Sequence, residues 1–565
     1  MAAHEIRPDV YGPGTFADVD FTPLPTEAAR LLRHLAQITP GFTASAAALE
    51  NVEFSGRDLP IIPGPLKSQA FTAALQAMIG IVGKELNELR GIAVGKIYID
   101  VDKCGLYPAT PALVSIGKMD IAEIQKTGTL AKVGTDVDHG VVNKTPLYVR
   151  SWAIYPTKDP VVWYQIMSSL DTPGFLESYG IDASMDVSSK DEAYEVLKKT
   201  FSKYSAAELD LKNMEDGFCG QTCYTPEQWR KTLMGKTLAR QPLVNIRRIN
   251  DGHGPVPLKG SEDKRPLAGV KIIELARVIA APATCAALAS LGAEIIKVQS
   301  PNIPDLQPLS LTLTAGKKIY ALDLTKQADK DKLHNLIDGA DVVVQAFRLG
   351  SMKRKGFGLE GILDIIKQRN KGIVYLDLNC YGPDGYYAER PGFQQIADAA
   401  SGCSYVMGKA YGFDEGVGVL PPLPIADMLS GALAVIDVML ALRDRAKHGG
   451  SYHANVALTA VDAIQLSKVF GLYSPEIVRK IQDTYNFAPM TPDLHVEELL
   501  YVLGDAWSKH GILKPEYMAS FTTQWGENHA ILSPIVKYDD SAAEPKWSHG
   551  PVPYCSSGTE PAWSS

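Results

Sequence analysis

Asp427 is the residue of this sequence whose position is best suited to chemistry. It stands in the segment PPLPIADMLSG, directly before the apolar run of residues 431–442, so the pattern places it in the first turn of a helix. Unpaired backbone N–H groups and the helix dipole stabilise an ionised carboxylate at such a position. Taken alone, however, an aspartate here is more often a helix cap than a reactive group.

The short motifs of common enzymes give no competing site. Residues 356–361, GFGLEG, fit the GxGxxG pattern, but they follow the charged run MKRK, whereas a dinucleotide-binding loop leaves a strand directly. The sequence contains no P-loop, HExxH, GxSxG or kinase signature. Cys219 and Cys223 lack a second pair of ligands at zinc spacing, so we interpret them as ordinary free thiols.

Composition and charge narrow the class of protein. The 565 residues, 45% of them apolar, are enough to form a large core in two or three domains. Lys and Arg number 56 against 64 Asp and Glu, and no long basic run occurs, so we expect no nucleic-acid partner. The apolar run of residues 431–442 is too short to span a bilayer, and neither end carries a targeting signal, which favours a cytoplasmic protein without a membrane partner.

Residues 266–465 show the pattern of an α/β domain. β-Branched runs alternate with helical stretches, which predicts a Rossmann-like parallel sheet with flanking helices. A long helix is expected over residues 427–445, with Asp427 at its start. The strands are expected at residues 269–275, 293–300, 341–347, 372–380 and 451–458.

A segment rich in Gly, Pro and charge, residues 250–269, indicates a domain boundary. Before it, an apolar helix at residues 66–91 and the strand GKIYIDVDK repeat the order helix, glycine turn, strand. We interpret this repeat as a degenerate internal duplication. The expected divisions are a degenerate half at 1–250, which includes a smaller α+β domain at about 145–250, a linker at 251–265, the Rossmann-like domain at 266–465 and a diverged C-terminal segment at 466–565.

Seven segments in the second half of the chain carry a family resemblance. In order, they are PLAGVKIIELARVIAAPATCAALASLGAEIIKVQSP, TAGKKIYALDL, ADVVVQAFRLGSMKRKGFG, YGPDG, RPGFQQIADAASG, PPLPIADMLSGALAVIDVMLALRDR and HGGSYHANVAL. They resemble the class III CoA-transferases, the CaiB/BaiF family, which also contains formyl-CoA transferases and α-methylacyl-CoA racemases. Residues 151–246 are similar to the small domain that follows such a unit in this family, although here they precede it.

The resemblance implies a reaction. Asp427 matches the family's aspartate nucleophile, whose carboxylate attacks an acyl-CoA thioester and then holds CoA as an aspartyl thioester until a second carboxylic acid collects it. The implied enzyme moves CoA from an acyl-CoA to a free carboxylic acid and needs no metal or redox cofactor. Residues 63–71, PGPLKSQAF, occupy the comparable place in the first half without a carboxylate, so we expect one reactive site per chain.

The same resemblance implies where CoA binds. Basic side chains in the matching segments would pair with the phosphates of the nucleotide, while Ala315 and Phe347 would shape the wall beside the adenine. The implied basic residues are Lys297, Lys317, Lys318, Arg348, and Lys353 or Arg354.

Three other functions stay open: an acyl-CoA racemase or epimerase, a lyase of the same family, and a CoA-binding pseudoenzyme. Phe393 stands where the racemases carry a catalytic histidine, so a two-base racemase would lack one base. Ile279 stands where formyl-CoA transferases carry a glutamine, and no GGGG loop occurs, which favours an acyl group larger or more apolar than formate or oxalate. Family members form interlocked homodimers, whereas the internal duplication would allow a monomer.

Overall fold

A seven-stranded sheet forms the centre of the molecule. The computed structural model describes residues 5–42, 45–130, 145–258, 260–303 and 305–564. The strand order is β10-β16-β15-β14-β11-β12-β13, in which β10 pairs antiparallel with β16 and all other neighbours are parallel. The strands are β10 (Asn245–Ile249), β11 (Lys271–Leu275), β12 (Glu294–Gln299), β13 (Lys317–Ala321), β14 (Val342–Gln345), β15 (Val374–Asn379) and β16 (Ser451–Ala457).

The strands form where β-branched residues run together. The VVVQ segment of β14 is buried along its whole length, which is typical of a parallel strand covered by helices on both faces. Successive side chains point to opposite faces, so Ile272 joins one apolar cluster and Ile273 the other. The expected Rossmann-like α/β fold is confirmed, and each of the five expected strand segments contains a strand.

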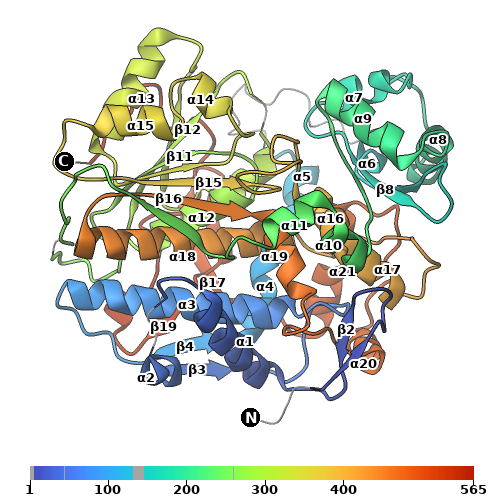
Figure 1. Cartoon of the computed structure of the whole chain (residues 1–565), viewed down its shortest axis with the longest axis horizontal. Helices are drawn as coiled ribbons and strands as arrows, with labels where there is room; N and C mark the ends of the chain where they lie inside the picture. The colour runs from blue at the N-terminus through green and yellow to red at the C-terminus, as the bar shows by residue number, and fades with distance from the viewer. Residues whose placement is uncertain (1–4, 43–44, 131–144, 259, 304, 565) are drawn as a thin grey trace.

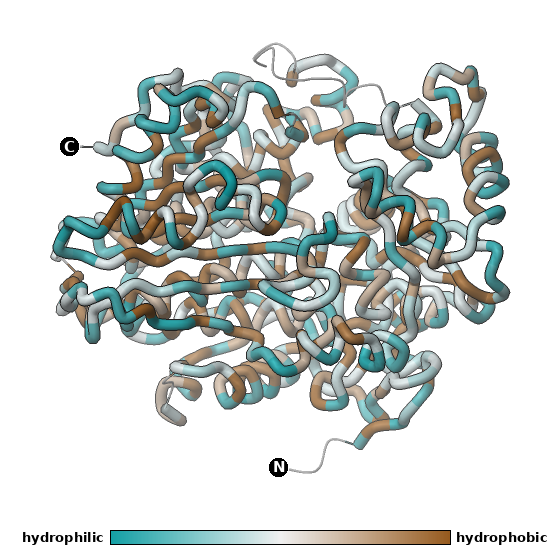
Figure 2. The backbone as a smooth tube through the Cα atoms, turned by 45° about the horizontal axis from the view of Figure 1, so that its top comes forward, coloured by the Kyte–Doolittle hydropathy of each residue, from teal (hydrophilic) through white to brown (hydrophobic). Residues whose placement is uncertain are grey.

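Helices cover both faces of this sheet (Figure 1). On one face, α13 (Gln327–Gly339) and α15 (Leu359–Ile366) share an apolar cluster with β11, β12 and β14. On the other face lie α12 (Ala280–Ser290) and α18 (Ile425–His448), and α3 (Ser68–Leu89) packs against the outer side of α18. Figure 2 shows hydrophobic stretches in these inner layers and hydrophilic stretches in the outer loops.

The helix α18 is a core element. Its 24 residues are long and apolar enough to cross a membrane. The expectation that this segment is too short to span a bilayer is therefore wrong, because the helix extends beyond residues 431–442 on both sides. However, 94% of its most apolar 18-residue window is buried within the fold. α18 therefore lies between the sheet and α3, where it holds Asp427 at one end of the molecule's central layers.

The N-terminal and C-terminal segments fold together. β19 (Lys537–Tyr538) pairs with β4 (Ile97–Asp100), which also pairs with β3 (Val52–Ser55). A second small sheet combines two strands from each end of the chain: β5 (Val114–Ile116), β6 (Met119–Asp120), β17 (Met518–Thr523) and β18 (Gly526–Leu532). The helix and strand that suggested an internal duplication are α3 and β4, and the duplication itself stays a prediction.

A smaller lobe precedes the large sheet in sequence, at the right of Figure 1. It contains an antiparallel three-stranded sheet and its own apolar cluster, in which Tyr155, Phe175 and Phe201 are fully buried. Its elements are α6 (Pro146–Arg150), β7 (Ile154–Pro156), β8 (Trp163–Met167), α7 (Thr172–Ser178), α8 (Lys190–Phe201), α9 (Ala206–Asp216) and β9 (Cys219–Thr222). The lobe matches the position expected for the α+β part of the chain, while the proposed domain boundaries stay a prediction.

Candidate active site

Asp427 lies in the first turn of α18, as the sequence predicts. Its neighbours Ala426 and Met428 are buried, whereas Asp427 is partly exposed. Among the described residues, none donates a hydrogen bond to its carboxylate, and the N-cap residue of the helix is Pro424, without a side-chain cap. Asp427 therefore does not act as a cap in this structure, and its role as a nucleophile stays a prediction.

The surroundings of this helix end are apolar. Met428 belongs to a buried cluster with Val278 and Leu313, against which Ile279 and Phe393 pack. Removal from water disfavours the charged form of a carboxyl group, and burial raises the pKa of Asp427 to about 7. At neutral pH the group is thus divided between a weakly solvated carboxylate and its acid.

Two further carboxyl groups lie behind Asp427 and were not predicted. Asp398 on α16 (Gln394–Ser401) and Asp462 on α19 (Leu458–Gln465) are buried and hydrogen-bonded to each other. Burial, together with the charge of Asp427, raises the pKa of both groups. Each carboxylate disfavours the charge of the other in this buried position, so the pair holds a proton more strongly than two solvated carboxyl groups would.

The acid pair is joined to the segment that leads into α18. The side-chain amide of Gln394 donates to Asp398 and also to the backbone carbonyl of Leu423, at 3.4 Å. Leu423 stands immediately before Pro424, where the helix of Asp427 begins. This network links the position of the candidate nucleophile to the buried acids, and it depends on the contacts of α16 with both α18 and α19.

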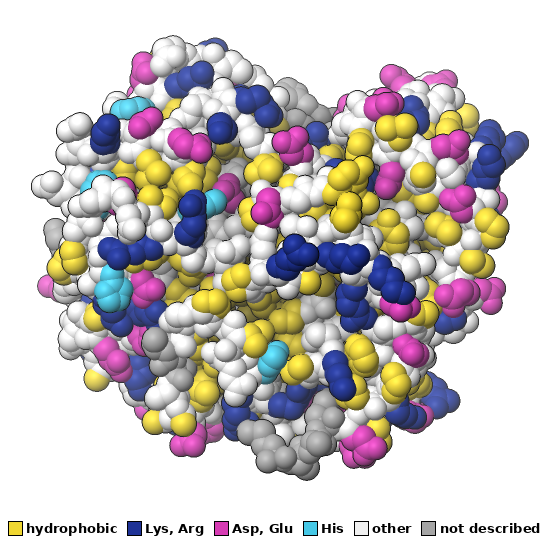
Figure 3. Space-filling model, viewed as in Figure 1, with side chains coloured by type: hydrophobic (Ala, Val, Ile, Leu, Met, Phe, Trp, Pro, Cys, Tyr) yellow, Lys and Arg dark blue, Asp and Glu magenta, His cyan; other side chains and the backbone are white. Residues whose placement is uncertain are grey.

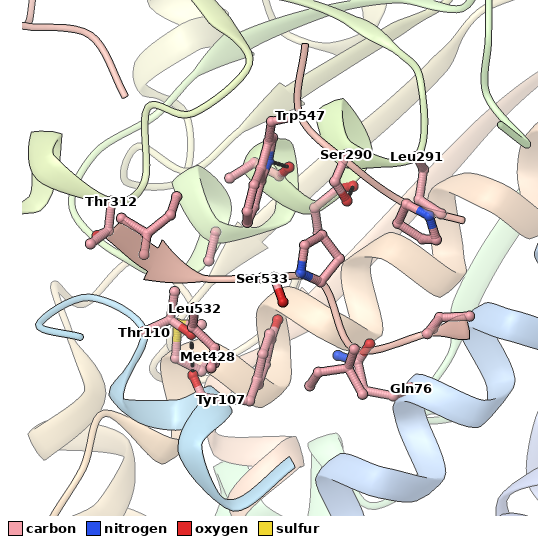
Figure 4. Close-up of a pocket in the computed structure, with 18 of the residues that line it drawn as sticks. Gln76, Tyr107, Thr110, Ser290, Leu291, Thr312, Met428, Leu532, Ser533 and Trp547 are labelled. Carbon is pink, nitrogen blue, oxygen red and sulfur yellow. Dashed lines mark hydrogen bonds between the residues drawn. The ribbon is translucent and has the colours of Figure 1, made fainter. Parts of the chain in front are cut away.

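A pocket begins beside the first turn of α18 (Figure 4). One face of α12 forms its wall, and Trp547 lies across that wall with its indole N–H donating to the carbonyl of Ala286 at 2.8 Å. Tyr107 and Thr110 approach from the N-terminal half, and Leu532 and Ser533 from the C-terminal segment. The pocket is thus built from parts of the chain that are hundreds of residues apart, which explains why no sequence motif indicates it.

Lys297 and Lys317 are buried on adjacent strands. Their ammonium groups both contact the carboxylate of Glu274, at 2.9 Å and 2.6 Å respectively. The side chain of Lys297 is 1% exposed and that of Lys317 is not exposed at all. In this structure both ammonium groups are directed to Glu274 and to backbone carbonyls, away from solvent.

The other implied CoA-binding residues are dispersed. Phe347, Arg348, Lys353 and Arg354 lie together where β14 ends and α14 (Ser351–Arg354) begins, on a lobe whose surface carries several Lys and Arg side chains (Figures 1 and 3). Lys318 lies on the edge strand β13 and contacts Glu294 at 2.8 Å, and Ala315 is buried in a different apolar cluster. The role of all these residues in CoA binding stays a prediction.

Arg277 is a cation that the sequence analysis did not single out. It follows the carboxyl end of β11, and its charge interacts with that of Arg348, which lies beyond the end of the neighbouring strand β14. Burial lowers the pKa of Arg277, although Asp305 acts in the opposite direction. Ligands of open parallel sheets bind outside the carboxyl ends of the strands, so the two arginines are well placed for an anionic ligand.

Comparisons with known proteins agree on one family. The profile of CoA-transferase family III matches residues 267–533. The chain is 47% identical to an acyl-CoA transferase of Gibberella moniliformis, over 97% of each protein. It is 31% identical to acetyl-coenzyme A transferase nodX of Hypoxylon pulicicidum, over 72% of this chain and 70% of that protein.

Solved structures give a weaker match. A hypothetical protein of Mycobacterium tuberculosis is 28% identical, with a TM-score of 0.31, over 39% of this chain and 58% of that one. A CAIB/BAIF family protein from Brucella suis is 25% identical, with a TM-score of 0.31, over 40% of this chain and 59% of that one. The chain thus spans less than two thirds of either solved chain.

Proposed function

The chain belongs to CoA-transferase family III, and on that premise we propose that it moves CoA from an acyl-CoA to a free carboxylic acid through a covalent intermediate on Asp427. One observation carries this proposal. The side chain of Asp427 lies in the first turn of α18, is partly exposed and does not cap the helix, and burial raises its pKa to about 7. The names of the two long relatives, an acyl-CoA transferase and an acetyl-coenzyme A transferase, support the same class of reaction.

The proposed reaction has two symmetric halves. First, a carboxylate oxygen of Asp427 attacks the thioester carbon, the C–S bond breaks, and a mixed anhydride and CoA thiolate form. The thiolate then attacks the Asp427 carbonyl carbon, which releases the donor's carboxylate and leaves an aspartyl-CoA thioester. The acceptor carboxylate attacks that thioester, and the released thiolate takes the acceptor acyl group from the second anhydride. Asp427 is regenerated, and no proton is gained or lost overall.

The environment of Asp427 suits this sequence. A carboxylate removed from water is a better nucleophile than a hydrated one, and the apolar cluster around Met428 supplies that condition. The helix N-terminus offsets part of the cost by stabilising the anion. With a pKa of about 7, a substantial fraction of the group is ionised at neutral pH while burial keeps the carboxylate poorly hydrated.

Trapping of the intermediate tests the proposal. The protein is incubated with acetyl-, hexanoyl-, decanoyl- and succinyl-CoA, quenched with hydroxylamine or borohydride, and analysed by peptide mass spectrometry. We expect modification of the peptide that contains Asp427, none in Asp427→Ala, and normal labelling in Asp444→Asn, a change near the other end of the same helix. Measurable CoA binding without any adduct would overturn the mechanism and favour a racemase, a lyase or a binding protein.

A further inference from the structure

We propose that the pocket between α12, α3 and the C-terminal segment binds the acyl group of the donor, and that it selects an apolar acyl group without a second charge. This inference rests on the proposed function and names the substrate class of the same site. Three observations support it: the position of the pocket, the shape of its wall and the residue types that line it.

The pocket reaches the residue next to Asp427 in the sequence. Met428, which lines the pocket, is the residue directly after Asp427. Ala283 also lines the pocket, and it belongs to the same buried cluster as Met428, against which Tyr107 packs. Asp427 itself does not line the pocket, so an acyl chain held at Asp427 would enter it beside Met428.

One face of α12 gives the pocket its length. Residues at helical spacing i, i+3, i+4 and i+7 lie on one face, and here they are Ala283, Ala286, Ala287 and Ser290. From the first to the last, the helix rises by roughly 10 Å at 1.5 Å per residue, which is enough for a medium-length acyl chain. All four side chains are small, which leaves space between this face of the helix and the opposite wall.

The lining of the pocket is mostly apolar and carries no charged side chain. No Lys, Arg, His, Asp or Glu is among the described residues that line it. Two of its hydroxyl groups donate to nearby backbone carbonyls, Ser290 to Ala287 and Thr110 to Tyr107, both at 2.7 Å. The wall opposite α12 consists of Ile79, Leu532, Pro534, Ile535 and Val536.

These features decide between two classes of acyl group. An aliphatic or aromatic acyl group would gain about 25 cal/mol for each Å² of apolar surface removed from water. A dicarboxylic acyl group such as succinyl would bring a second carboxylate into a lining without charged side chains, where an unpaired charge is strongly unfavourable. The cation behind the wall, Lys103, already donates to Ser533 at 2.6 Å and to the carbonyl of Pro534 at 2.8 Å. The pocket therefore favours acyl-CoAs derived from apolar monocarboxylic acids.

A chain-length series tests the assignment. We measure kcat/KM for acetyl-, hexanoyl-, decanoyl- and succinyl-CoA with one acceptor, and expect the protein to prefer hexanoyl- or decanoyl-CoA over succinyl-CoA. Ala287→Phe fills the middle of the pocket and should lower the ratio of decanoyl to acetyl activity at least tenfold. Ala287→Leu, a smaller change, should lower the same ratio less. The matched control is Ala207→Phe at an exposed position of α9, which should leave the ratio as it is.

The outcomes separate this inference from the proposed function. If transfer or the Asp427 adduct occurs but succinyl-CoA is the best donor, the apolar pocket is not the acyl site and the inference is wrong while the function stands. The same holds if both Ala287 variants keep the wild-type ratio. If no donor gives transfer or an adduct, the proposed function fails, and the acyl assignment fails with it.

Discussion

Lys317 and Glu274 form an ion pair of 2.6 Å in which neither side chain is exposed to solvent. Lys297 contacts the other carboxylate oxygen at 2.9 Å, so one carboxylate on β11 holds two cations, on β12 and β13. Although burial acts to raise it, the two lysines hold the pKa of Glu274 below its usual range. Lys317 also donates to the carbonyl of Pro282, which ties the edge of the sheet to the start of α12.

We expect the adjacent residues Lys317 and Lys318 to differ sharply in their effect on stability. Lys317→Met removes a buried cation and leaves Glu274 with one partner, which should lower the free energy of unfolding by about 3 kcal/mol. Lys318 is 38% exposed and pairs with Glu294 at the surface, so Lys318→Met should cost less than about 1 kcal/mol. Urea denaturation measures both changes. Equal stability of the two variants would show that the buried pair does not secure this edge of the sheet.

Arg348 should contribute to the binding of CoA. It is exposed beyond the end of β14, it donates to the carbonyl of Gly217 at 2.8 Å, and it interacts electrostatically with Arg277. Loss of one charge-assisted contact to a phosphate should weaken CoA binding about tenfold in Arg348→Ala. Isothermal titration with CoA and with pantetheine checks the cause, because pantetheine carries no phosphate and should bind both proteins alike. Lys509→Ala, at an exposed position far along the chain on α21 (Val496–Lys509), is the control.

The sequence predicts the large sheet well because its strands are local features. The composition of a run such as VVVQ predicts a buried strand, and the long apolar run of α18 predicts a buried helix. The position of Asp427 at the start of that helix is confirmed for the same reason. The three-stranded sheet of β3, β4 and β19 could not be predicted. Residues 52–55 and residues 537–538 both pair with β4, and pairing between segments so far apart leaves no local pattern in the sequence.

The contacts of the candidate site residues could not be predicted from the sequence either. Lys297 and Lys317 match the family's segments as cations, but only the register of β11, β12 and β13 shows that both face Glu274. Asp398 lies within RPGFQQIADAASG, one of the segments that carry the family resemblance, but nothing in that segment indicates its partner, because Asp462 is on another helix. Residue types indicated the chemistry, whereas tertiary packing determined which charges are paired.

The rate of adduct formation should depend on pH through Asp427. The attacking species is the carboxylate, and burial raises the pKa of this group to about 7. The rate should therefore rise about tenfold per pH unit below pH 7 and level off above it. Initial rates of Asp427 labelling from pH 5.5 to 8.5 test this expectation. A midpoint near pH 4 would mean that the carboxylate is well solvated, contrary to its position in the structure.

The buried pair of Asp398 and Asp462 should make the protein less stable as pH rises. In the unfolded chain these carboxyl groups lose their protons near pH 4, whereas the folded pair, whose pKa values are raised, keeps at least one. For these two groups the folded state then binds more protons than the unfolded state, so their contribution to stability is greatest in acid and falls as pH rises from about 4 towards the pKa of the pair.

Asp462→Asn tests this sign. The amide of the new side chain can donate to Asp398 without a titrating proton, so the variant should exceed the wild type in free energy of unfolding by about 1 kcal/mol at pH 8 and by less at pH 5. Denaturation at the two pH values gives the difference, with the exposed Asp364→Asn on α15 as the control. A variant that is equally destabilised at both pH values would show that the pair contributes by shape and not through its shared proton. If Asp462→Asn is more stable than the wild type at pH 8 only, the two buried acids destabilise the wild-type protein at that pH.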